Sequence, residues 1–130
     1  MHTIRLAGPW TVVRGDGPPR KVRMPAAWEA VFASPGTAKF TRRFNRPPGL
    51  DDDARVWLSV AEYRGTIQVR LDGVLLTEPA ADEPVRVRLE ELSPFPRLDI
   101  TLTVAGGEPP QGLYGPVVLE IEGASEADTS

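Results

Sequence analysis

The sequence predicts an all-β fold, a two-sheet antiparallel jelly-roll sandwich. Prolines and glycines, 14 and 12 in number, gather in clusters, and short runs of Val, Leu, Ile and aromatic residues separate those clusters. Within the runs, apolar and polar residues alternate with period two, as half-buried strands require. Punctuated short runs of this kind indicate strands and turns. The clusters are Gly15–Pro19, Pro47–Gly49 and Gly106–Pro110.

The first half of the chain contributes five strand-like segments. Between the third and fourth, Pro25 opens a turn, and the segment Ala27–Ala33 suits one helical turn because Trp28 and Phe32 stand at i and i+4. The fourth segment alternates most clearly, with Phe40 and Phe44 on one face. The five segments are Ile4–Leu6, Trp10–Arg14, Lys21–Met24, Ala38–Phe44 and Arg55–Val60.

The second half contributes five more strand-like segments. Asp72-Gly73 separates the first two, and Asp-Gly between apolar runs is the signal of a type I′ hairpin. The remaining three alternate with period two. The five segments are Thr66–Leu71, Val74–Leu76, Val85–Leu89, Leu98–Val104 and Val117–Ile121.

The alternation also predicts the core. We expect one face of each strand to be largely buried, and Trp10 to join the core. The residues predicted to be buried are Phe40, Phe44, Val56, Leu58, Ile67, Val69, Leu71, Ile100, Leu102 and Leu119.

Length and composition bound the class of protein. A chain of 130 residues predicts a single domain, which we place at 1–122, followed by a flexible polar tail at 123–130. Cysteine is absent, so no disulfide or thiol chemistry is possible. The net charge is −3 and basic residues form no stripe along the sequence, which argues against nucleic acid and membrane as partners. No signal peptide or membrane-length apolar run is present, so we expect a soluble, cytoplasmic protein.

Five motifs in order resemble the sugar-binding jelly-roll domain of glycoside hydrolase family 2, the family of β-galactosidases and β-glucuronidases. They span about a hundred residues and are Leu6–Trp10, Met24–Trp28, Gly36–Phe44, Arg70–Gly73 and Gly112–Glu120. The resemblance implies a galactose-binding-domain-like fold and a non-catalytic carbohydrate-binding or accessory module. The alternative is a structural or protein-interaction domain that keeps the fold without a sugar site, with a protein or a second copy of the chain as its partner.

The sequence also departs from the family pattern. The hairpin asparagine is Asp72, and the segment Thr77–Glu83 lacks the histidine and glycine that often follow the hairpin. In the family the catalytic glutamates reside in a barrel that this sequence does not contain, so no residue here inherits a catalytic role. We therefore predict that the chain is not an enzyme.

The residues themselves offer little catalytic chemistry. His2 is the one histidine and lies at the start of the chain, where we expect fraying. Glu90 and Glu91 are adjacent, and on a strand they would point to opposite faces, so a solvated turn is favoured over a pair that flanks one sugar. Asp51–Asp53 is either a calcium-binding loop or a charged loop tip, and the latter is favoured because the spacing of a calcium loop is not evident. No metal site and no cofactor are predicted.

Arg42 lies among apolar neighbours on its strand, whereas Arg43 falls on the polar face. A buried arginine must be paired, so we expect Arg42 to be partly buried and bonded to an acidic side chain or to backbone carbonyls, with ligand contact as the alternative.

Any sugar site is expected at a loop end of the sandwich, with Trp28, Tyr63, Arg64 and Tyr114 as the binding residues. Trp28 follows the Pro25 turn, and Tyr63-Arg64-Gly65 links two strands. Aromatic rings offer apolar faces to the C–H side of sugars, and arginine donates directional hydrogen bonds. Trp57 is a further aromatic, either packed under a loop or presented on a sheet. Core or loop packing is the competing interpretation for each of these residues.

Overall fold

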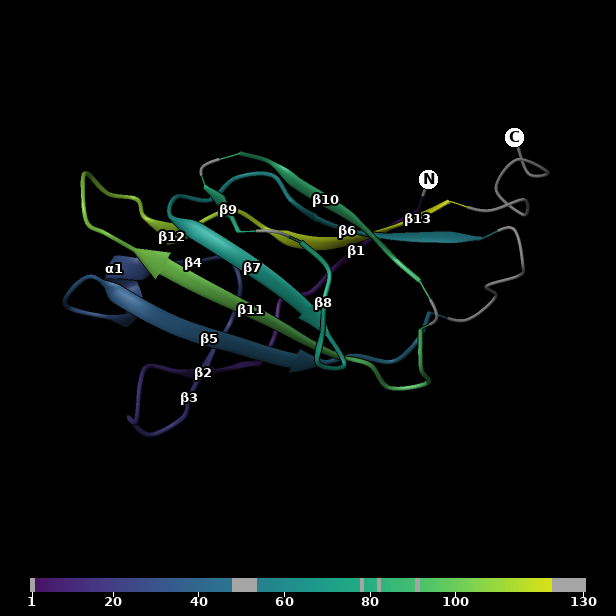
Figure 1. Ribbon diagram of the computed structural model, residues 1–130, viewed down its shortest axis with the longest axis horizontal. Coiled ribbons are helices and arrows are strands. Elements are labelled where there is room, and N and C mark those ends of the chain that lie inside the picture. Colours follow the sequence, from purple (N-terminus) through teal and green to yellow (C-terminus); the bar gives the residue numbers. More distant parts are fainter. Residues whose placement is uncertain (1, 48–53, 78, 82, 91, 123–130) are drawn as a thin grey trace.

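The computed structural model is an antiparallel β-sandwich, which confirms the predicted fold class (Figure 1). The structure describes residues 2–47, 54–77, 79–81, 83–90 and 92–122. Within those residues one short helix occurs, α1 (Trp28–Val31), where one helical turn was expected. No described helix is long and apolar enough to cross a membrane.

The smaller of the two main sheets has four antiparallel strands. Their order is β1 (His2–Arg5), β13 (Val117–Glu122), β6 (Arg55–Val60) and β10 (Val85–Leu89). His2 pairs with Ile121, so the expectation of a frayed start at His2 is wrong. Pairing with the last described strand supplies hydrogen bonds that the isolated N-terminal segment would lack.

The larger sheet has seven strands, and Figure 1 looks onto it. The order is β3 (Arg20–Val22), β2 (Trp10–Val13), β5 (Gly36–Arg43), β11 (Arg97–Val104), β7 (Thr66–Leu71) and β8 (Val74–Leu75), and β9 (Ala80–Ala81) also pairs with β7. A third, two-stranded sheet pairs β12 (Gly112–Leu113) with β4 (Ala26–Ala27). The sequence did not predict β4, β9 or β12, because two residues are too few to show a period.

The hairpin between β7 and β8 has the predicted geometry. Asp72 and Gly73 both have positive φ, 49° and 85°, as a type I′ turn needs. The Asp72 carboxylate accepts hydrogen bonds from the Arg97 amide at 2.8 Å and from the Ser93 hydroxyl at 3.0 Å. The backbone bond from Arg97, helped by Ser93 and by the charges of Arg43 and Arg97, holds the pKa of Asp72 below its ordinary value. The hairpin is thereby tied to the chain that enters β11.

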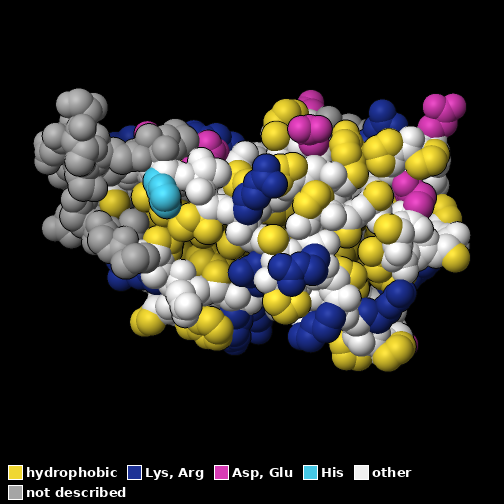
Figure 2. Space-filling model, turned by 180° about the vertical axis from the view of Figure 1, so that it is seen from behind, with side chains coloured by type: hydrophobic (Ala, Val, Ile, Leu, Met, Phe, Trp, Pro, Cys, Tyr) yellow, Lys and Arg dark blue, Asp and Glu magenta, His cyan; other side chains and the backbone are white. Residues whose placement is uncertain are grey.

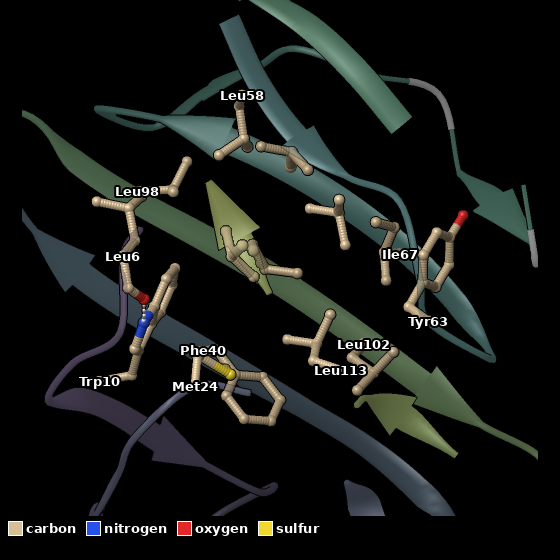
Figure 3. Close-up of a cluster of buried hydrophobic side chains, with 14 of the residues drawn as sticks. Leu6, Trp10, Met24, Phe40, Leu58, Tyr63, Ile67, Leu98, Leu102 and Leu113 are labelled. Carbon is tan, nitrogen blue, oxygen red and sulfur yellow. Dashed lines mark hydrogen bonds between the residues drawn. The ribbon is translucent and has the colours of Figure 1, made fainter. Parts of the chain in front are cut away.

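The core lies between the two main sheets (Figure 3). All ten side chains predicted to be buried are buried, and so is Trp10, whose Nε1–H donates to the Leu6 carbonyl at 2.7 Å. Trp28 and Tyr63 also belong to this core, each 4% exposed. Two of the four predicted sugar-binding residues are therefore mostly covered by other residues.

Arg42 is half-buried, as predicted, but its predicted pairing is wrong. Its Nη1 is buried and has no hydrogen-bond partner among the described residues. Arg42 faces Leu98 across the β5–β11 pair, on the side of the sheet that is lined by apolar side chains. Desolvation, with a smaller contribution from the charge of Arg23, holds the pKa of Arg42 below its ordinary value. Asp99 follows Leu98, the residue that pairs with Arg42, but its carboxylate bonds to Thr41 and Arg97 instead.

The outer face of the seven-stranded sheet collects basic residues that are scattered along the sequence. Register places Lys21, Lys39, Arg43, Arg70 and Arg97 on this face, on β3, β5, β7 and β11. The sequence predicted basic residues that are spread without a stripe, and the fold corrects this by bringing five of them onto one face. Figure 2 shows the opposite side of the molecule, where His2 is cyan and cations lie among apolar and acidic side chains.

Candidate functional site

A groove of about 590 Å³ opens at the end of the sandwich where β6 leads into β7. Three of the four predicted binding residues line it, namely Tyr63, Arg64 and Tyr114. We call it the loop-end groove. Its other lining residues are Gly65, Thr66, Ala81, Thr103, Ala105, Gly106 and Gln111.

Two chain segments are joined by backbone hydrogen bonds along one side of the groove. The Arg64 amide donates to the Gly112 carbonyl at 3.0 Å, and the Gly112 amide donates back to Arg64 at 2.8 Å. Gly115 donates to the Glu62 carbonyl at 3.0 Å and extends the pairing. This pairing is what brings the Tyr63-Arg64 loop and Tyr114 to a common rim, since the two segments are far apart in sequence.

Gly65 is required where this loop crosses the end of β11. Its φ is +120°, and an added Cβ would lie 2.5 Å from the Thr103 carbonyl oxygen. A side chain at this position would therefore push the loop away from the sheet. The close approach keeps Arg64 beside the groove.

The three groove residues differ in what they offer a ligand. Tyr63 is buried, with its ring beside Ile67 and its hydroxyl pointing away from the labelled cluster in Figure 3. Arg64 is exposed, and its Nη1 donates to the Glu108 carbonyl at a long 3.3 Å. Tyr114 is half-buried. Arg64 and Tyr114 are therefore the accessible members of the predicted set.

Trp28 lies next to the groove and does not line it. Its indole Nε1–H donates to the Ser34 carbonyl at 2.9 Å, and its ring packs against Phe32 with centroids 4.6 Å apart. The Arg14 guanidinium lies 5.7 Å from the Trp28 centroid. Trp28 lines a separate hollow of about 190 Å³ that shares Gly106 and Gln111 with the groove. The core interpretation therefore fits Trp28 better than an exposed sugar platform.

Thr66, Thr103 and Gln111 are polar groove residues that sequence reasoning missed, and Gln111 is the one that is buried. Its side chain is 9% exposed, its Nε2 donates to the Glu108 carbonyl at 2.6 Å, and its amide donates to Glu29 Oε1 at 2.9 Å. The sequence marks this region only as a Gly/Pro-rich turn. Nothing local shows that the residue after Pro110 turns inward, because its partners are Glu108 beside it and Glu29 far along the chain.

Trp57 lies on the outer face of the four-stranded sheet, away from the groove. The Arg86 guanidinium covers its ring at 4.0 Å from the centroid, and Glu120 and Glu122 bond Arg86 at 3.1 and 2.9 Å. Desolvation alone would lower the pKa of Arg86, but the bonds to Glu120 and Glu122 outweigh it and raise that pKa. Trp57 therefore lies on the sheet, as one of the two interpretations had it, but Arg86 covers its ring and its Nε1 is buried, so the ring is not open to a ligand.

Metal and acid chemistry are sparse among the described residues. No cluster of three or more His, Asp or Glu side chains forms there. The predicted alternatives at Asp51–Asp53 lie outside the described residues, as does Glu91. The described lining of the loop-end groove contains no carboxylate, and Arg64 is its single charged side chain.

Solved structures of glycoside hydrolase family 2 enzymes share this fold. A β-glucuronidase from Dictyoglomus thermophilum has a TM-score of 0.76 at 14% identity over 95% of this chain and 28% of its own. An FMN-binding β-glucuronidase from Faecalibacterium prausnitzii has a TM-score of 0.75 at 20% identity, with coverages of 92% and 22%. A β-galacturonidase from Eisenbergiella tayi bound to galacturonate has a TM-score of 0.70 at 19% identity, over 92% of this chain and 24% of its own.

The chain spans less than a third of the length of these enzymes. No protein-family model matches the sequence, and no curated protein matches it. The likeness confirms at the level of fold the resemblance that the five sequence motifs carry. The chain thus has the β-sandwich fold of a domain of glycoside hydrolase family 2 enzymes.

Proposed function

We propose that this chain is a non-catalytic carbohydrate-binding accessory module, with the loop-end groove as its sugar site. The observation that carries the proposal is the convergence of Tyr63, Arg64 and Tyr114 from separate segments on one concave surface. The fold shared with domains of sugar-processing enzymes supports the same function.

The groove has the size and chemistry that a short saccharide needs. Its volume of about 590 Å³ lies within the range of small-molecule sites, about 300–1,000 Å³. Arg64 supplies several N–H donors, and the hydroxyls of Thr66 and Thr103 both donate and accept. Tyr114 supplies a half-exposed ring for the C–H face of a sugar. Since the groove is open, we expect weak affinity.

Hydrolysis is not part of this proposal. Glycoside hydrolysis commonly uses two carboxyl groups about 5–9.5 Å apart across the bond that breaks. The described groove residues supply none. We expect no turnover of nitrophenyl glycosides by this chain, and turnover abolished by changing a single carboxylate would contradict the proposal.

A calorimetric titration with galactose, glucose, glucuronate and galacturonate tests the groove. We expect at least one sugar to bind, and Arg64→Ala and Tyr114→Ala each to weaken it roughly tenfold, since each removes about 1.4 kcal/mol of polar or stacking contact. Arg88→Ala on β10 is the matched control and should bind like the wild type. If a sugar binds and neither groove variant weakens it, the site lies elsewhere.

The alternative, a protein-interaction module, draws on a different surface. Val74, Leu75 and Phe95 are 64%, 40% and 50% exposed. The Asp72 hydrogen bonds hold the β7–β8 hairpin against the segment that contains Phe95. If no sugar binds at millimolar concentration, and Phe95→Ser converts an oligomer seen by sedimentation into a monomer, this alternative replaces the first.

A further inference from the structure

The outer face of the seven-stranded sheet is strongly basic, although the whole chain carries a net charge of −3. In register, Lys21 pairs with Thr11, Thr11 with Thr41, Thr41 with Asp99, and Asp99 with Arg70. Paired residues of this kind share a face of the sheet, so these positions form one row across it. Arg43 and Arg97 pair in the next row, and Lys39 pairs with both Val13 and Thr101.

Asp99 is the one carboxylate among these outward positions of the described strands, and it is already bonded. It is 3% exposed, its Oδ1 accepts from the Thr41 hydroxyl at 2.6 Å, and its Oδ2 accepts from Arg97 Nε at 3.1 Å. Lys21 and Lys39 pair in register with threonine and valine and with no carboxylate, whereas Arg43 lies close enough to Asp72 for its charge to lower the pKa of that carboxyl group. Arg43 and Arg97 also stand directly opposite each other, an arrangement that like charges disfavour. Asp72 and Asp99 offset part of that repulsion, and an external anion would offset more of it.

The face also has a hollow and a connection to the loop-end groove. A hollow of about 360 Å³ lies beside Lys39, lined partly by Val13, Thr37 and Thr101. Thr103 hydrogen-bonds Thr37 at 2.9 Å on the sheet surface and at the same time lines the groove, as does Thr66, its partner on β7. A ligand in the groove can therefore continue onto the sheet past these threonines.

We infer that the outer face of the seven-stranded sheet binds an acidic polysaccharide, which extends from the loop-end groove toward Lys39 and Arg43. This inference rests on the proposed function, because it takes the groove as a saccharide site and adds the charge of the ligand and its path. Threonine hydroxyls hydrogen-bond sugar hydroxyls, and the cations attract the carboxylate or sulfate groups of the polymer.

The composition of the face favours an acidic polysaccharide over an acidic protein or a nucleic acid as the ligand. Protein interfaces have an apolar centre, whereas the positions between these cations are mainly threonine, with Gln68 and Val13. Single-stranded nucleic acid stacks successive bases on aromatic rings, and the outward positions of β2, β5, β7 and β11 hold none; Phe95, whose ring lies 5.7 Å from the Arg43 guanidinium, offers one ring at the edge of this face.

Native electrophoresis through gels containing polygalacturonate tests the inference. We expect the polymer to retard the wild type, and the retardation to fall as salt is raised. The double variant Lys39→Gln, Arg43→Gln should bind at least about tenfold more weakly, since each cation near a polyanionic surface contributes roughly a factor of five. The matched control removes two charges from the other sheet, Arg55→Gln with Arg88→Gln, and should bind like the wild type.

Arg43 also donates a hydrogen bond to the Phe95 carbonyl, so its substitution could disturb the local structure as well as remove a charge. A second variant controls for this effect. Lys21→Gln with Lys39→Gln leaves that contact intact and should weaken binding to a similar degree. Equal losses in the face and control variants overturn the inference. So does equal retardation by polyglutamate or single-stranded DNA, which would show general attraction to polyanions.

Neutral galactan separates the two proposals. If galactan retards the chain as strongly as polygalacturonate and Arg64→Ala abolishes both, the groove function stands and the acidic path is wrong. If neither polysaccharide retards the wild type and no sugar binds in the calorimeter, both proposals fail.

Discussion

Replacing Arg42 with methionine should stabilise the protein. Arg42 has a buried Nη1 with no hydrogen-bond partner among the described residues, and both desolvation and the charge of Arg23 lower its pKa. Methionine is unbranched, fills a similar volume and has no donor to leave unpaired. The variant therefore removes a cost and keeps the packing between Phe40 and Phe44.

The expected gain is about 1 kcal/mol. A buried donor without a partner costs roughly 1–3 kcal/mol, and we take the lower end because Arg42 is only half-buried and its other N–H groups can be hydrated. For a domain of this length 1 kcal/mol corresponds to an increase in Tm of about 3–5 °C. Since arginine stays charged at ordinary pH, the gain should be constant from about pH 5 to pH 9.

Calorimetric melting of Arg42→Met beside Arg88→Met measures this gain. Arg88 is exposed and its nearest carboxylate, on Glu90, lies 3.8 Å away, so Arg88→Met controls for the β-propensity and hydrophobicity of methionine. We expect Arg88→Met to shift Tm by less than about 2 °C. If Arg42→Met melts several degrees below the wild type, the Arg42 guanidinium is satisfied in solution and the reasoning is wrong.

Three further changes test the turn, the groove loop and the core. Asp72→Asn keeps the type I′ turn, and because the folded pKa of Asp72 is lowered, its stabilisation is present above about pH 3.9 and is lost as the pH falls through the folded pKa. The difference in Tm from wild type should therefore shrink as the pH falls below about 3.9, and a difference that stays constant down to the acid limit of folding contradicts the assignment. Gly65→Ala should cost at least about 2–3 kcal/mol in urea unfolding, because the new Cβ meets a main-chain oxygen of β11, whereas Gly15→Ala, with open space around it, should cost about 1 kcal/mol. Equal costs would mean that the close approach is unimportant. Trp10→Phe leaves the Leu6 carbonyl without its donor and should lower stability by about 2–4 kcal/mol, and an unchanged urea midpoint would refute that role.

The sequence predicted the strands well wherever a run was long enough to show its period. β6 and β7 have the predicted bounds, and the Asp72-Gly73 turn has the predicted signs of φ. Both features depend on neighbouring residues alone. The short strands β4, β9 and β12 depend on partners brought by the rest of the fold, so no local pattern announces them.

The site was predicted less completely, for a related reason. The loop position of Tyr63-Arg64 was visible in the sequence, and the structure places it on the groove. Whether an aromatic ring is covered depends on what packs against it, and Trp28 is covered by Phe32, Arg14 and the backbone near Gly112. Arg42 shows the same limit, because period two assigned its face correctly but could not tell whether a hydrogen-bond acceptor reaches its guanidinium on that face.

The basic face extends this reasoning from single residues to a surface. The alternation that puts Phe40 and Ile100 into the core must put Lys39 and Thr101 outside, since the side-chain period is two. Antiparallel pairing then places outward residues of strands that lie far apart in sequence next to one another. Lysines and arginines that are scattered along the sequence therefore share one positively charged face. A chain with net negative charge can in this way present a positive surface. The ligand of such a protein is therefore better inferred from the charge of each sheet face than from the net charge of the sequence.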